Sequence, residues 1–464
     1  MAELADIGVV GLGVMGSNLA MNLAEKGFRV AIFDRDPAKR AALAKGPMHE
    51  GFINCADEPG DVREIRAPRA LILMVPAGVS TDDAIATFSK AMSPGDLLID
   101  AGNSDFHDTR RRAADLEARG LTFLGIGVSG GAEGARHGPA LMAGGSPKVW
   151  ERVAPTLTAI AARHGDEPCA AWLGSDGAGH FVKTVHNGIE YADMQMIAEV
   201  YGLMRDGLGA DEDAVSGAFR DWSKGPLASY LVEITAEVAS AKDALTDQPL
   251  LRVIADKAGQ KGTGRWSAIE GQRLGATATT IEAAVAARNL SAASDLRKAL
   301  SEPVQAELTL GTNDLHGALH AGKIIAYAQG FDLLTRASAE YKWDLKLADI
   351  ARVWRAGCII RSRMLDDIAE AFEAEPDASL LTAPAFRKHL AASVPALRET
   401  VAEAARAAIP TPALSSALSY LDQLARPKGT ANMLQGLRDY FGRHGFERTD
   451  REGAGFHGPW DGGA

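Results

Sequence analysis

A glycine-rich turn between an apolar run and a helical pattern constrains the fold of this chain more than any other stretch. The run Ile7 to Val10 leads directly into the sequence Gly-Leu-Gly-Val-Met-Gly, and residues 18–26 then have helical spacing. In such a strand, turn and helix, the first glycine permits the tight turn, the second lets the backbone approach a pyrophosphate, and the third lets helix and strand pack closely. A second apolar strand, 29–33, ends at Asp34, 23 residues after Gly11, where an acid that binds ribose belongs. We therefore expect a dinucleotide site, with a purely structural turn as the alternative; its residues are Gly11, Leu12, Gly13, Val14, Met15, Gly16, Asp34, Arg35 and Asp36.

Further apolar runs predict a parallel, doubly wound sheet. Strands are expected at residues 70–75, 96–100 and 121–125, separated by helical patterns of ten or more residues. Ligands bind at the carboxyl ends of such strands. Each end carries a loop of small residues, and three of them at one edge predict a binding crevice, although any single one could be an ordinary loop. The loop residues are Val75, Pro76 and Ala77, then Ala101, Gly102, Asn103 and Ser104, then Val128, Ser129, Gly130 and Gly131.

The second half of the chain has a different pattern. From about Ala178 onward the strand signals stop, and Ala, Leu, Glu and Arg recur at helical spacing. A length of 464 residues also exceeds what one core usually supports. The last 25 or so residues are rich in Gly, Arg and aromatics, and the stretch from Gly453 to Ala464 is too rich in glycine to form a packed helix. Such a tail frays unless something holds it. We expect a Rossmann-like domain at 1–177, an all-helical domain at 178–434 and a tail at 435–464, whose course after Glu447 the sequence does not predict.

One predicted helix carries polar groups on a single face. At about 100° per residue, five polar residues of the segment 179–191 fall within an arc of about 140°, while apolar residues point elsewhere. A helix that is otherwise this apolar is usually buried, so the polar stripe must meet a partner, a ligand or a cleft. A buried network between two helices and a reactive site remain open as interpretations. The five residues are Lys183, His186, Asn187, Glu190 and Tyr191.

Composition excludes several classes of protein. The net charge of −11 argues against a nucleic-acid partner, and no run of 18 apolar residues is present to cross a membrane. The first six residues lack the pattern of a signal peptide, so we expect a cytoplasmic protein. Three widely spaced cysteines, Cys55, Cys169 and Cys358, indicate neither a disulfide framework nor a zinc site. We expect no metal.

Taken together, the motifs resemble those of the 6-phosphogluconate dehydrogenase family, the decarboxylating enzymes of the oxidative pentose phosphate route. The resemblance spans the whole chain, and several matching segments are long and nearly unbroken. These segments are 7–16, 102–104, 127–131, 177–191, 258–266, 324–331, 357–362 and 438–444.

The resemblance implies roles for individual residues. In the family, the lysine at the position of Lys183 is the general base and the glutamate at the position of Glu190 is the general acid. Two residues of the tail, Arg438 and His444, match contacts that the family supplies from the neighbouring subunit, which implies a homodimer with tail exchange at the active site. The implied substrate contacts are Asn103, Ser129, Gly130, Gly131, His186, Asn187, Tyr191, Lys261, Thr263, Arg288, Arg438 and His444.

These residues suit the implied reaction, which is oxidation of the C3 hydroxyl of 6-phosphogluconate, loss of CO2 and protonation of the enediol to ribulose 5-phosphate. Lys183 can accept a proton only when neutral, so its pKa must fall from about 10.4 through desolvation or nearby positive charge. Glu190 must be protonated in order to donate, so burial must raise its pKa. The protonated lysine can polarise the ketone, which removes the need for a metal.

The expected cofactor is NADP or NAD. The segment Asp34-Arg35-Asp36 departs from the family, whose NADP-using members commonly show Asn-Arg followed by Ser or Thr. An acid at residue 34 favours the ribose hydroxyl of NAD and repels the phosphate of NADP, whereas Arg35 can hold that phosphate. We therefore predict dual use, with NAD accepted unusually well.

Two alternatives remain open. Another β-hydroxyacid dehydrogenase would share the glycine turn and a lysine on a helix, but it would not need Lys261, Arg288 and Arg438 to hold a terminal phosphate. In a cofactor-binding regulator without turnover, the acid and the base should be lost earlier than the glycine turn is, yet Lys183 and Glu190 are both present.

Overall fold

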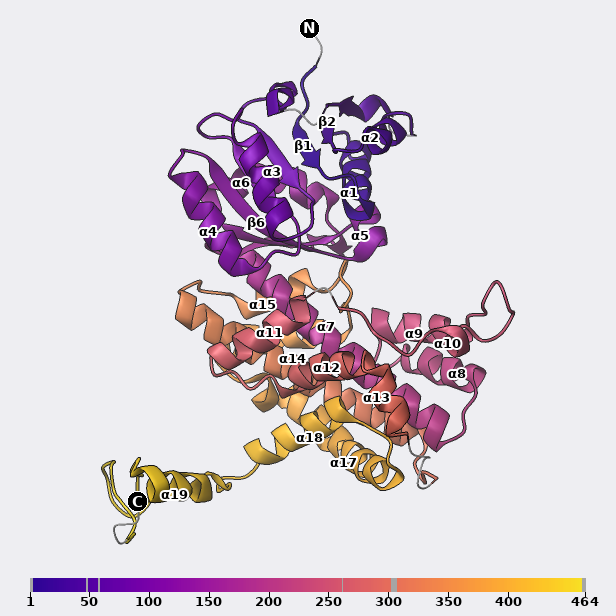
Figure 1. The fold of residues 1–464 in the computed structure, drawn as a ribbon, viewed down its shortest axis with the longest axis vertical. Helices are drawn as coiled ribbons and strands as arrows, with labels where there is room; N and C mark the ends of the chain where they lie inside the picture. Colours follow the sequence, from indigo (N-terminus) through magenta and orange to yellow (C-terminus); the bar gives the residue numbers. More distant parts are fainter. Residues whose placement is uncertain (1–2, 47–48, 57–58, 261, 302–306, 461–464) are drawn as a thin grey trace. The chain divides into compact units, whose positions relative to one another are not determined.

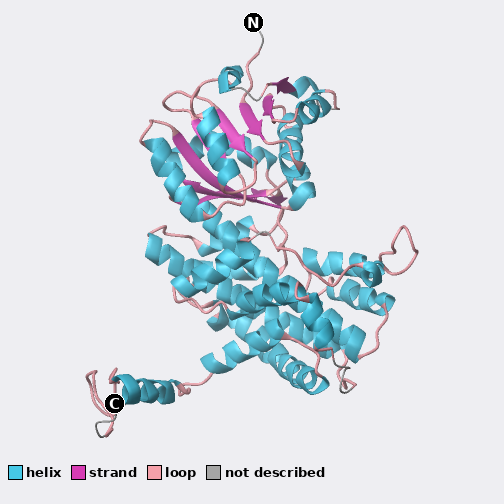
Figure 2. Ribbon diagram, in the orientation of Figure 1, coloured by secondary structure: helices cyan, strands magenta, loops and turns pink. Residues whose placement is uncertain are grey.

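A computed structural model describes residues 3–46, 49–56, 59–260, 262–301 and 307–460. Contacts divide the chain into a core unit, residues 1–417, and a tail unit, residues 418–464. The core unit contains a sheet with its flanking helices and a large helical part (Figures 1 and 2). The tail unit contains the end of α18 (Pro412–Leu424), helix α19 (Ala431–Gly442) and a glycine-rich loop.

The sheet has eight strands in the order β10-β7-β6-β5-β4-β1-β2-β3. The six strands from β6 to β3 run parallel and follow the order 3-2-1-4-5-6 of a dinucleotide-binding sheet. Strand β7 pairs with β6 in the antiparallel sense, and β10 runs parallel to β7. The strands are β1 Ile7–Val10, β2 Val30–Phe33, β3 Phe52–Asn54, β4 Ala70–Leu73, β5 Leu97–Asp100, β6 Thr122–Ser129, β7 Ala140–Gly145 and β10 Ala170–Gly174, with a separate pair β8 Arg163–His164 and β9 Glu167–Pro168.

The five strands expected from the sequence are present and run parallel, as predicted, and the sheet gains further strands at its two edges. Strands β3, β7 and β10 were missed, and β7 reverses direction. Strand β6 also continues to Ser129, four residues beyond its expected end, because residues 124–129 pair with β7. Val128 and Ser129 therefore lie in the strand, Gly130 forms the turn, and Gly131 is the first residue of α5 (Gly131–His137).

Two apolar cores cover the two faces of the sheet, because side chains alternate along each strand. Leu97 and Ile99 of β5 face helices α1 and α6, whereas Leu98 between them faces α3 and α4. All three side chains are at most 1% exposed. The flanking helices are α1 Val14–Glu25, α2 Pro37–Ala44, α3 Val79–Phe88, α4 Phe106–Glu117, α5 Gly131–His137 and α6 Pro147–Ile160.

The helical part is built around α7 and α14, which pack against each other. Helix α7 also contacts β6, β7 and β10, so it joins the helical part to the sheet. Among the described residues no strand follows β10, as the sequence predicts. The helices are α7 Ala178–Gly202, α8 Glu212–Trp222, α9 Tyr230–Ser240, α10 Leu250–Val253, α11 Thr263–Arg273, α12 Thr279–Ser291, α13 Ser294–Ala299, α14 Thr312–Tyr341, α15 Leu347–Val353, α16 Met364–Ala374, α17 Pro384–Ala407, α18 Pro412–Leu424 and α19 Ala431–Gly442. None of the described helices combines the length and the apolar character that crossing a membrane would need.

Candidate active site

Helix α7 lies directly on the sheet because glycines stand where the two meet. A Cβ atom at Gly127 of β6 would lie 2.3 Å from Cβ of Lys183, and one at Gly144 of β7 would lie 2.3 Å from the backbone nitrogen of Gly179. Any larger residue at these points would force the helix away from the strands. The close approach brings Lys183 and His186 to the carboxyl end of β6, where Ser129 lies.

The polar stripe of α7 forms a buried hydrogen-bond network around His186. Ser129 Oγ lies 3.2 Å from His186 Nε2, and His186 Nδ1 lies 3.0 Å from Asn187 Oδ1. The Asn187 amide in turn donates to Thr263 Oγ1 at 2.9 Å. In this arrangement Nδ1 donates its proton to Asn187, so it offers no lone pair to an ammonium group at Lys183 Nζ, 3.4 Å away. The network therefore suits a neutral amine at Lys183.

The pKa values of the lysine and the glutamate on this helix are shifted in opposite directions. Burial lowers the pKa of Lys183, and the charge of Glu190 opposes this shift only in part. Burial also raises the pKa of Glu190, against the effects of Lys183 and Arg288. The pKa of His186 falls well below its usual value because the ring is buried and faces Lys183. A base and an acid that sequence reasoning requires to be neutral and protonated thus lie in surroundings that favour those forms.

The Glu190 end of the stripe is more open than the lysine end. Its side chain is 20% exposed, and Oε2 lies 3.7 Å from His186 Nδ1. Next to Glu190, the ring of Tyr191 stacks against the guanidinium of Arg288 from α12, which lies 3.5 Å from the ring centre. The same guanidinium donates to the carbonyl oxygen of Gly259 at 3.2 Å. The stripe is therefore a buried hydrogen-bond network at one end and lies beside the cation of Arg288 at the other.

The turn after β6 leaves backbone open to a ligand. Gly130 has φ +116° and packs against the carbonyl oxygen of Gly357, while Gly131 has φ +63°. A Cβ atom at Gly131 would meet nothing within 4 Å, whereas one at Gly130 would lie 2.6 Å from that oxygen. Gly130 thus fixes the turn on the loop at Gly357, and Gly131 faces open space.

The other residues that the resemblance implies for substrate binding do not all lie near this network. Thr263 opens α11 directly after Gly262, which has φ +97°, and it contacts Asn187 as described above. Lys261 lies outside the described residues. Arg438 and His444 belong to the tail unit, where both are exposed.

The glycine turn after β1 fits a dinucleotide. A Cβ atom at Gly11, which has φ +90°, would lie 2.5 Å from the carbonyl oxygen of Met74, and one at Gly16 would lie 1.8 Å from the carbonyl oxygen of Gly11. A Cβ at Gly13 would instead meet nothing within 4 Å. Two glycines are thus required by packing, and the middle one leaves the start of α1 open to a pyrophosphate.

The acids after β2 are held by backbone amides. Asp34 accepts from the amide of Leu12 at 2.6 Å and from the amide of Asp36 at 2.9 Å, and Asp36 caps α2 by accepting from Ala38 at 2.8 Å. Two cations that sequence reasoning missed lie here: Lys39 Nζ is 3.8 Å from Asp34 Oδ2, and Arg40 donates to the Asp34 carbonyl. Their only signal was their position in the first turns of α2.

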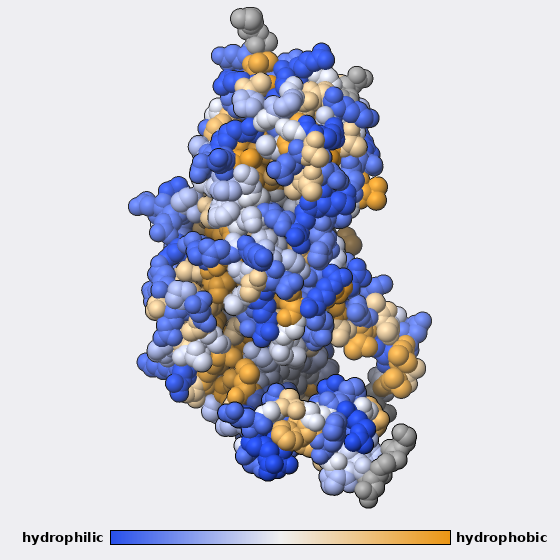
Figure 3. Space-filling view, turned by 90° about the vertical axis from the view of Figure 1, so that its left-hand side faces the viewer, coloured by the Kyte–Doolittle hydropathy of each residue, from blue (hydrophilic) through white to orange (hydrophobic). Residues whose placement is uncertain are grey.

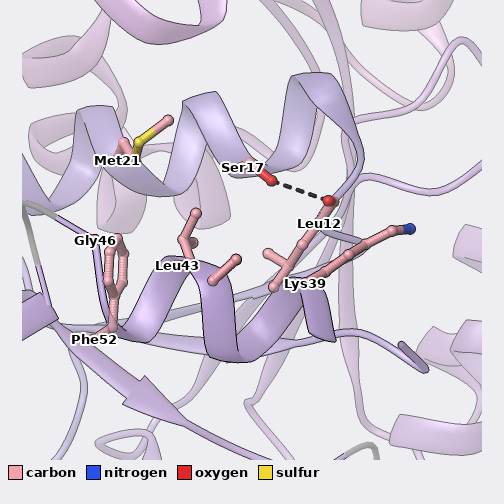
Figure 4. A pocket seen from close by; sticks show the side chains of 8 residues that line it. Leu12, Ser17, Met21, Lys39, Leu43, Gly46 and Phe52 are labelled. Atoms are coloured by element: carbon pink, nitrogen blue, oxygen red, sulfur yellow. Dashed lines mark hydrogen bonds between the residues drawn. The ribbon is translucent and has the colours of Figure 1, made fainter. Parts of the chain in front are cut away.

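A cavity of about 270 Å³ adjoins this acid between α1 and α2 (Figure 4). Lys39 and Leu12 line it beside Ser17, whose hydroxyl donates to the Leu12 carbonyl at 2.9 Å. Met21, Leu43 and Phe52 supply apolar walls, so the cavity has its charged group next to the glycine turn and an apolar floor.

The loops after β4 and β5, for which the sequence predicts cofactor contacts, are held together by a buried arginine that sequence reasoning missed. Arg112 of α4 donates to the carbonyl oxygen of Gly78 at 3.0 Å, to Asp100 at 3.2 Å and to Ser104 at 3.2 Å. Gly78 follows Val75, Pro76 and Ala77, and Asp100 and Ser104 flank Asn103. The Arg112 side chain is 1% exposed. It therefore fixes the spacing of the loops after β4 and β5.

Within the described part of the chain, no group of three or more His, Cys, Asp or Glu side chains is arranged to hold a metal ion. The three cysteines are buried and unpaired as disulfides.

The dinucleotide turn, the ribose acid and a buried lysine at the carboxyl edge of one sheet define an NAD(P)-binding oxidoreductase with a Rossmann-type sheet. Two family profiles cover nearly all of the chain: "NAD binding domain of 6-phosphogluconate dehydrogenase" matches residues 6–174, and "6-phosphogluconate dehydrogenase, C-terminal domain" matches residues 179–460. The chain belongs to the 6-phosphogluconate dehydrogenase family.

Individual relatives agree with this assignment. The chain is 44% identical to "6-phosphogluconate dehydrogenase, NAD(+)-dependent, decarboxylating" of Bacillus subtilis, over 98% of this chain and 99% of that protein. It is 43% identical to the NADP(+)-dependent enzyme of the same organism, over 98% of each chain. A solved structure of Plasmodium falciparum 6-phosphogluconate dehydrogenase superposes with a TM-score of 0.93 at 37% identity, covering 98% of this chain and 100% of that one. Overall identity therefore does not discriminate between the two cofactors.

Proposed function

We propose that this protein oxidises and decarboxylates 6-phospho-D-gluconate to D-ribulose 5-phosphate and CO2, with reduction of NAD(P)+, in the oxidative pentose phosphate route of the cytoplasm. The observation that carries the proposal is the buried lysine beside a neutral histidine and a buried glutamate, on a helix that reaches the carboxyl edge of a dinucleotide-binding sheet. Membership of a family whose relatives are named for this reaction supports the substrate.

In the proposed first step, the neutral amine of Lys183 removes the proton from the C3 hydroxyl of the substrate. A nicotinamide dinucleotide, held through its pyrophosphate by the turn at residues 11–16 and through its ribose by Asp34, would accept the hydride. His186 and Asn187 orient the amine, because their hydrogen bonds to each other and to Ser129 and Thr263 leave the rings and amides little freedom. Burial lowers the pKa of Lys183, which favours the neutral amine that this role requires.

The second step uses Lys183 in its protonated form, and the third step uses protonated Glu190. The Lys183 ammonium formed in the first step donates to the new C3 ketone, which accepts the electron pair as the C1–C2 bond breaks and CO2 leaves. Glu190 then delivers its proton to the enediol carbon. The two residues lie seven positions apart, roughly 10 Å along the helix axis, so they can act at opposite ends of the reacting carbons.

We propose dual cofactor use. Asp34 disfavours the phosphate of NADP, but it lies among Arg35, Lys39 and Arg40, which favour an anion. Asp36 is engaged as the cap of α2 and opposes the phosphate less than its charge suggests. NAD(+)-dependent and NADP(+)-dependent relatives of near-equal identity are compatible with a pocket that accepts both.

We also propose a homodimer in which the tail of one subunit completes the active site of the other, with domains at 1–177, 178–434 and 435–464. Five apolar residues of α19 are 57–68% exposed and follow helical spacing, which suits a face that packs on another surface: Met433, Leu434, Leu437, Tyr440 and Phe441. Apolar side chains also reach the surface in several patches over the helical part of the core unit (Figure 3). Contacts from Arg438 and His444 would add positive charge to an active site in an acidic protein.

A truncation tests the shared site. Chains that end before Arg438 should bind 6-phosphogluconate weakly and dimerise less, while NAD(P) binding, measured by fluorescence titration, should be unchanged. Normal substrate affinity together with an intact dimer would show that the tail does not complete the site. Activity itself is tested with 6-phosphogluconate, gluconate and small hydroxy acids, and a preference for an unphosphorylated acid would contradict the proposed substrate.

A further inference from the structure

The tail unit is ordered although its sequence is rich in glycine. After α19 the chain turns back on itself, and Phe446 and Phe456 pair in the antiparallel sense with backbone bonds of 2.8 and 3.1 Å. A Cβ atom at Gly445 would lie 2.8 Å from Cα of Gly455, so the two strands of this loop touch through glycine. We call residues 443–460 the tail loop; in Figure 1 it lies beside α19, at the yellow end of the chain.

One carboxylate holds the tail loop on α19. Asp439 is 0% exposed, and its Oδ1 accepts from the amide of Gly445 at 3.0 Å and from His457 Nδ1 at 2.7 Å. Its Oδ2 accepts from the amide of Gly458 at 2.8 Å and from Trp460 Nε1 at 2.6 Å. Two donors thus point at each oxygen, and all four come from the tail unit itself. These bonds, with the Gly458 amide first among them, hold the pKa of Asp439 well below its usual value, so the group stays ionised at neutral pH.

Asp439 also anchors the backbone on both sides of His444. The amide of Arg443 donates to the Asp439 carbonyl at 2.9 Å, and the amide of Gly445 donates to the Asp439 carboxylate. His444 lies between these two anchored residues, with its ring against Gly442, where a Cβ atom would lie 2.6 Å from the ring. Arg438 directly precedes Asp439 on α19. The two exposed residues that we propose for substrate binding are therefore both adjacent to anchored backbone.

Asp439 lies on the side of α19 opposite to the exposed apolar face. At about 100° per residue, Asp439 points about 200° away from the centre of the face formed by Met433, Leu434, Leu437, Tyr440 and Phe441. A change at Asp439 should therefore alter the tail loop while leaving the face that we propose for dimerisation intact.

We propose that Asp439 is a positioning residue for the substrate phosphate: it folds the tail loop in advance, so that Arg438 and His444 reach the partner's active site in a fixed geometry. The inference rests on the proposed function, in which these two residues contact the substrate. A loop ordered before binding loses less conformational entropy when the substrate arrives, so its contacts contribute more to affinity.

Asp439→Asn tests the inference with little change in size. The amide nitrogen of asparagine would face two N–H donors, so one oxygen and its two hydrogen bonds are lost. We expect the KM for 6-phosphogluconate to rise about tenfold or more, with the KM for the nicotinamide cofactor and the dimer unchanged and kcat affected less. The matched control is Asp450→Asn in the same loop, because the exposed Asp450 carboxylate forms ion pairs with the exposed Arg448 and Arg451. The KM of this control should stay at the level of the unmodified protein.

A double-mutant cycle with Arg438→Ala separates this inference from the proposed function. If Asp439 acts through Arg438, the two changes together should raise KM by much less than the product of their separate effects. A normal KM in Arg438→Ala would refute the tail contacts themselves. A raised KM in Arg438→Ala with a normal KM in Asp439→Asn, or strictly multiplicative effects, would overturn the positioning role while leaving the tail contacts in place.

A milder variant covers the case in which Asp439→Asn loses the dimer. Trp460→Phe removes one donor to Asp439 but retains an aromatic ring next to Tyr440, whose ring centre lies 5.5 Å from that of Trp460. An intermediate rise in the KM for 6-phosphogluconate, with the dimer retained by size-exclusion chromatography, supports the inference. An unchanged KM in this variant would count against it.

Discussion

Replacing Gly127 by alanine should displace Lys183, the proposed base, while leaving its amine chemically unchanged. The added Cβ would lie 2.3 Å from Cβ and 2.9 Å from Cγ of Lys183. Gly127 is not among the glycines with positive φ, so alanine fits its backbone and is opposed by space alone. Because contact is comfortable only from about 3.4 Å, the side chain of Lys183 must retreat by about 1 Å.

The expected size of the effect follows from this displacement. A shift of about 1 Å in a catalytic group costs about 10²-fold in rate, and overpacking of a close contact costs about 1–3 kcal/mol of stability. We therefore expect kcat to fall about a hundredfold and the free energy of unfolding to fall within that range, while the dissociation constant for NADP+ stays the same because the glycine turn of β1 is not involved.

Single-turnover formation of reduced nicotinamide measures the hydride step, and chemical denaturation measures stability. Gly202→Ala near the end of the same helix is the control, since a Cβ there meets nothing within 4 Å and its φ is −59°. This control should keep normal kcat and gain up to about 1 kcal/mol of stability. A hydride step in Gly127→Ala as fast as in the unmodified protein would refute the claim that contact with β6 places Lys183.

Three further predictions follow from the site. Glu190→Gln should shift the acidic limb of the pH profile for hydride transfer to lower pH, because the carboxylate charge raises the pKa of Lys183 and its loss lowers that pKa further; an unmoved limb would show that the two groups are not coupled. Asp34→Asn should move the ratio of kcat/KM for NADP to that for NAD at least about tenfold toward NADP, whereas no change, or a preference for NADP above a hundredfold before substitution, would show that the neighbouring cations govern the pocket. Arg112→Met should lower the free energy of unfolding by about 3–5 kcal/mol and weaken NADP+ binding, because Arg112 holds the loops after β4 and β5. The control is Arg111→Met, on the exposed side of the same helix, which should change the free energy of unfolding by about 0.5 kcal/mol or less. Equal effects of the two changes would contradict the role of Arg112.

Much of the fold and part of the site could be predicted because local patterns specify them. The turn at Gly11 follows a strand and precedes a helix, and the stripe from Lys183 to Tyr191 has the period of one helix face, so both are visible within a few residues. The antiparallel strand 140–145 escaped prediction because Ala, Met and Gly dominate it and its direction is decided only by pairing with 124–129.

The missed residues share one property, which is that distant chain segments define their roles. Arg112 matters because folding brings Gly78, Asp100 and Ser104 to it, and nothing in its own helix distinguishes it from its arginine neighbours. Asp439 lies beside Arg438, which the resemblance identified. Three of the four hydrogen-bond donors to Asp439 lie 18 to 21 residues along the chain, and the fourth, the amide of Gly445, lies 6 residues away. The sequence indicated that the tail frays unless something holds it, and the structure identified this carboxylate as the group that anchors the tail loop.

A comparison of the unmodified protein with Lys183→Met tests whether Lys183 is the base of an oxidative decarboxylation. With 6-phospho-D-gluconate and NADP+ or NAD+, the unmodified protein should release CO2 and form ribulose 5-phosphate in equal amounts to the reduced nicotinamide. Lys183→Met should bind the cofactor normally and lose about 10²–10⁴-fold or more in hydride transfer. Reduced nicotinamide without CO2 in the unmodified protein, or near-normal turnover in Lys183→Met, would contradict the account.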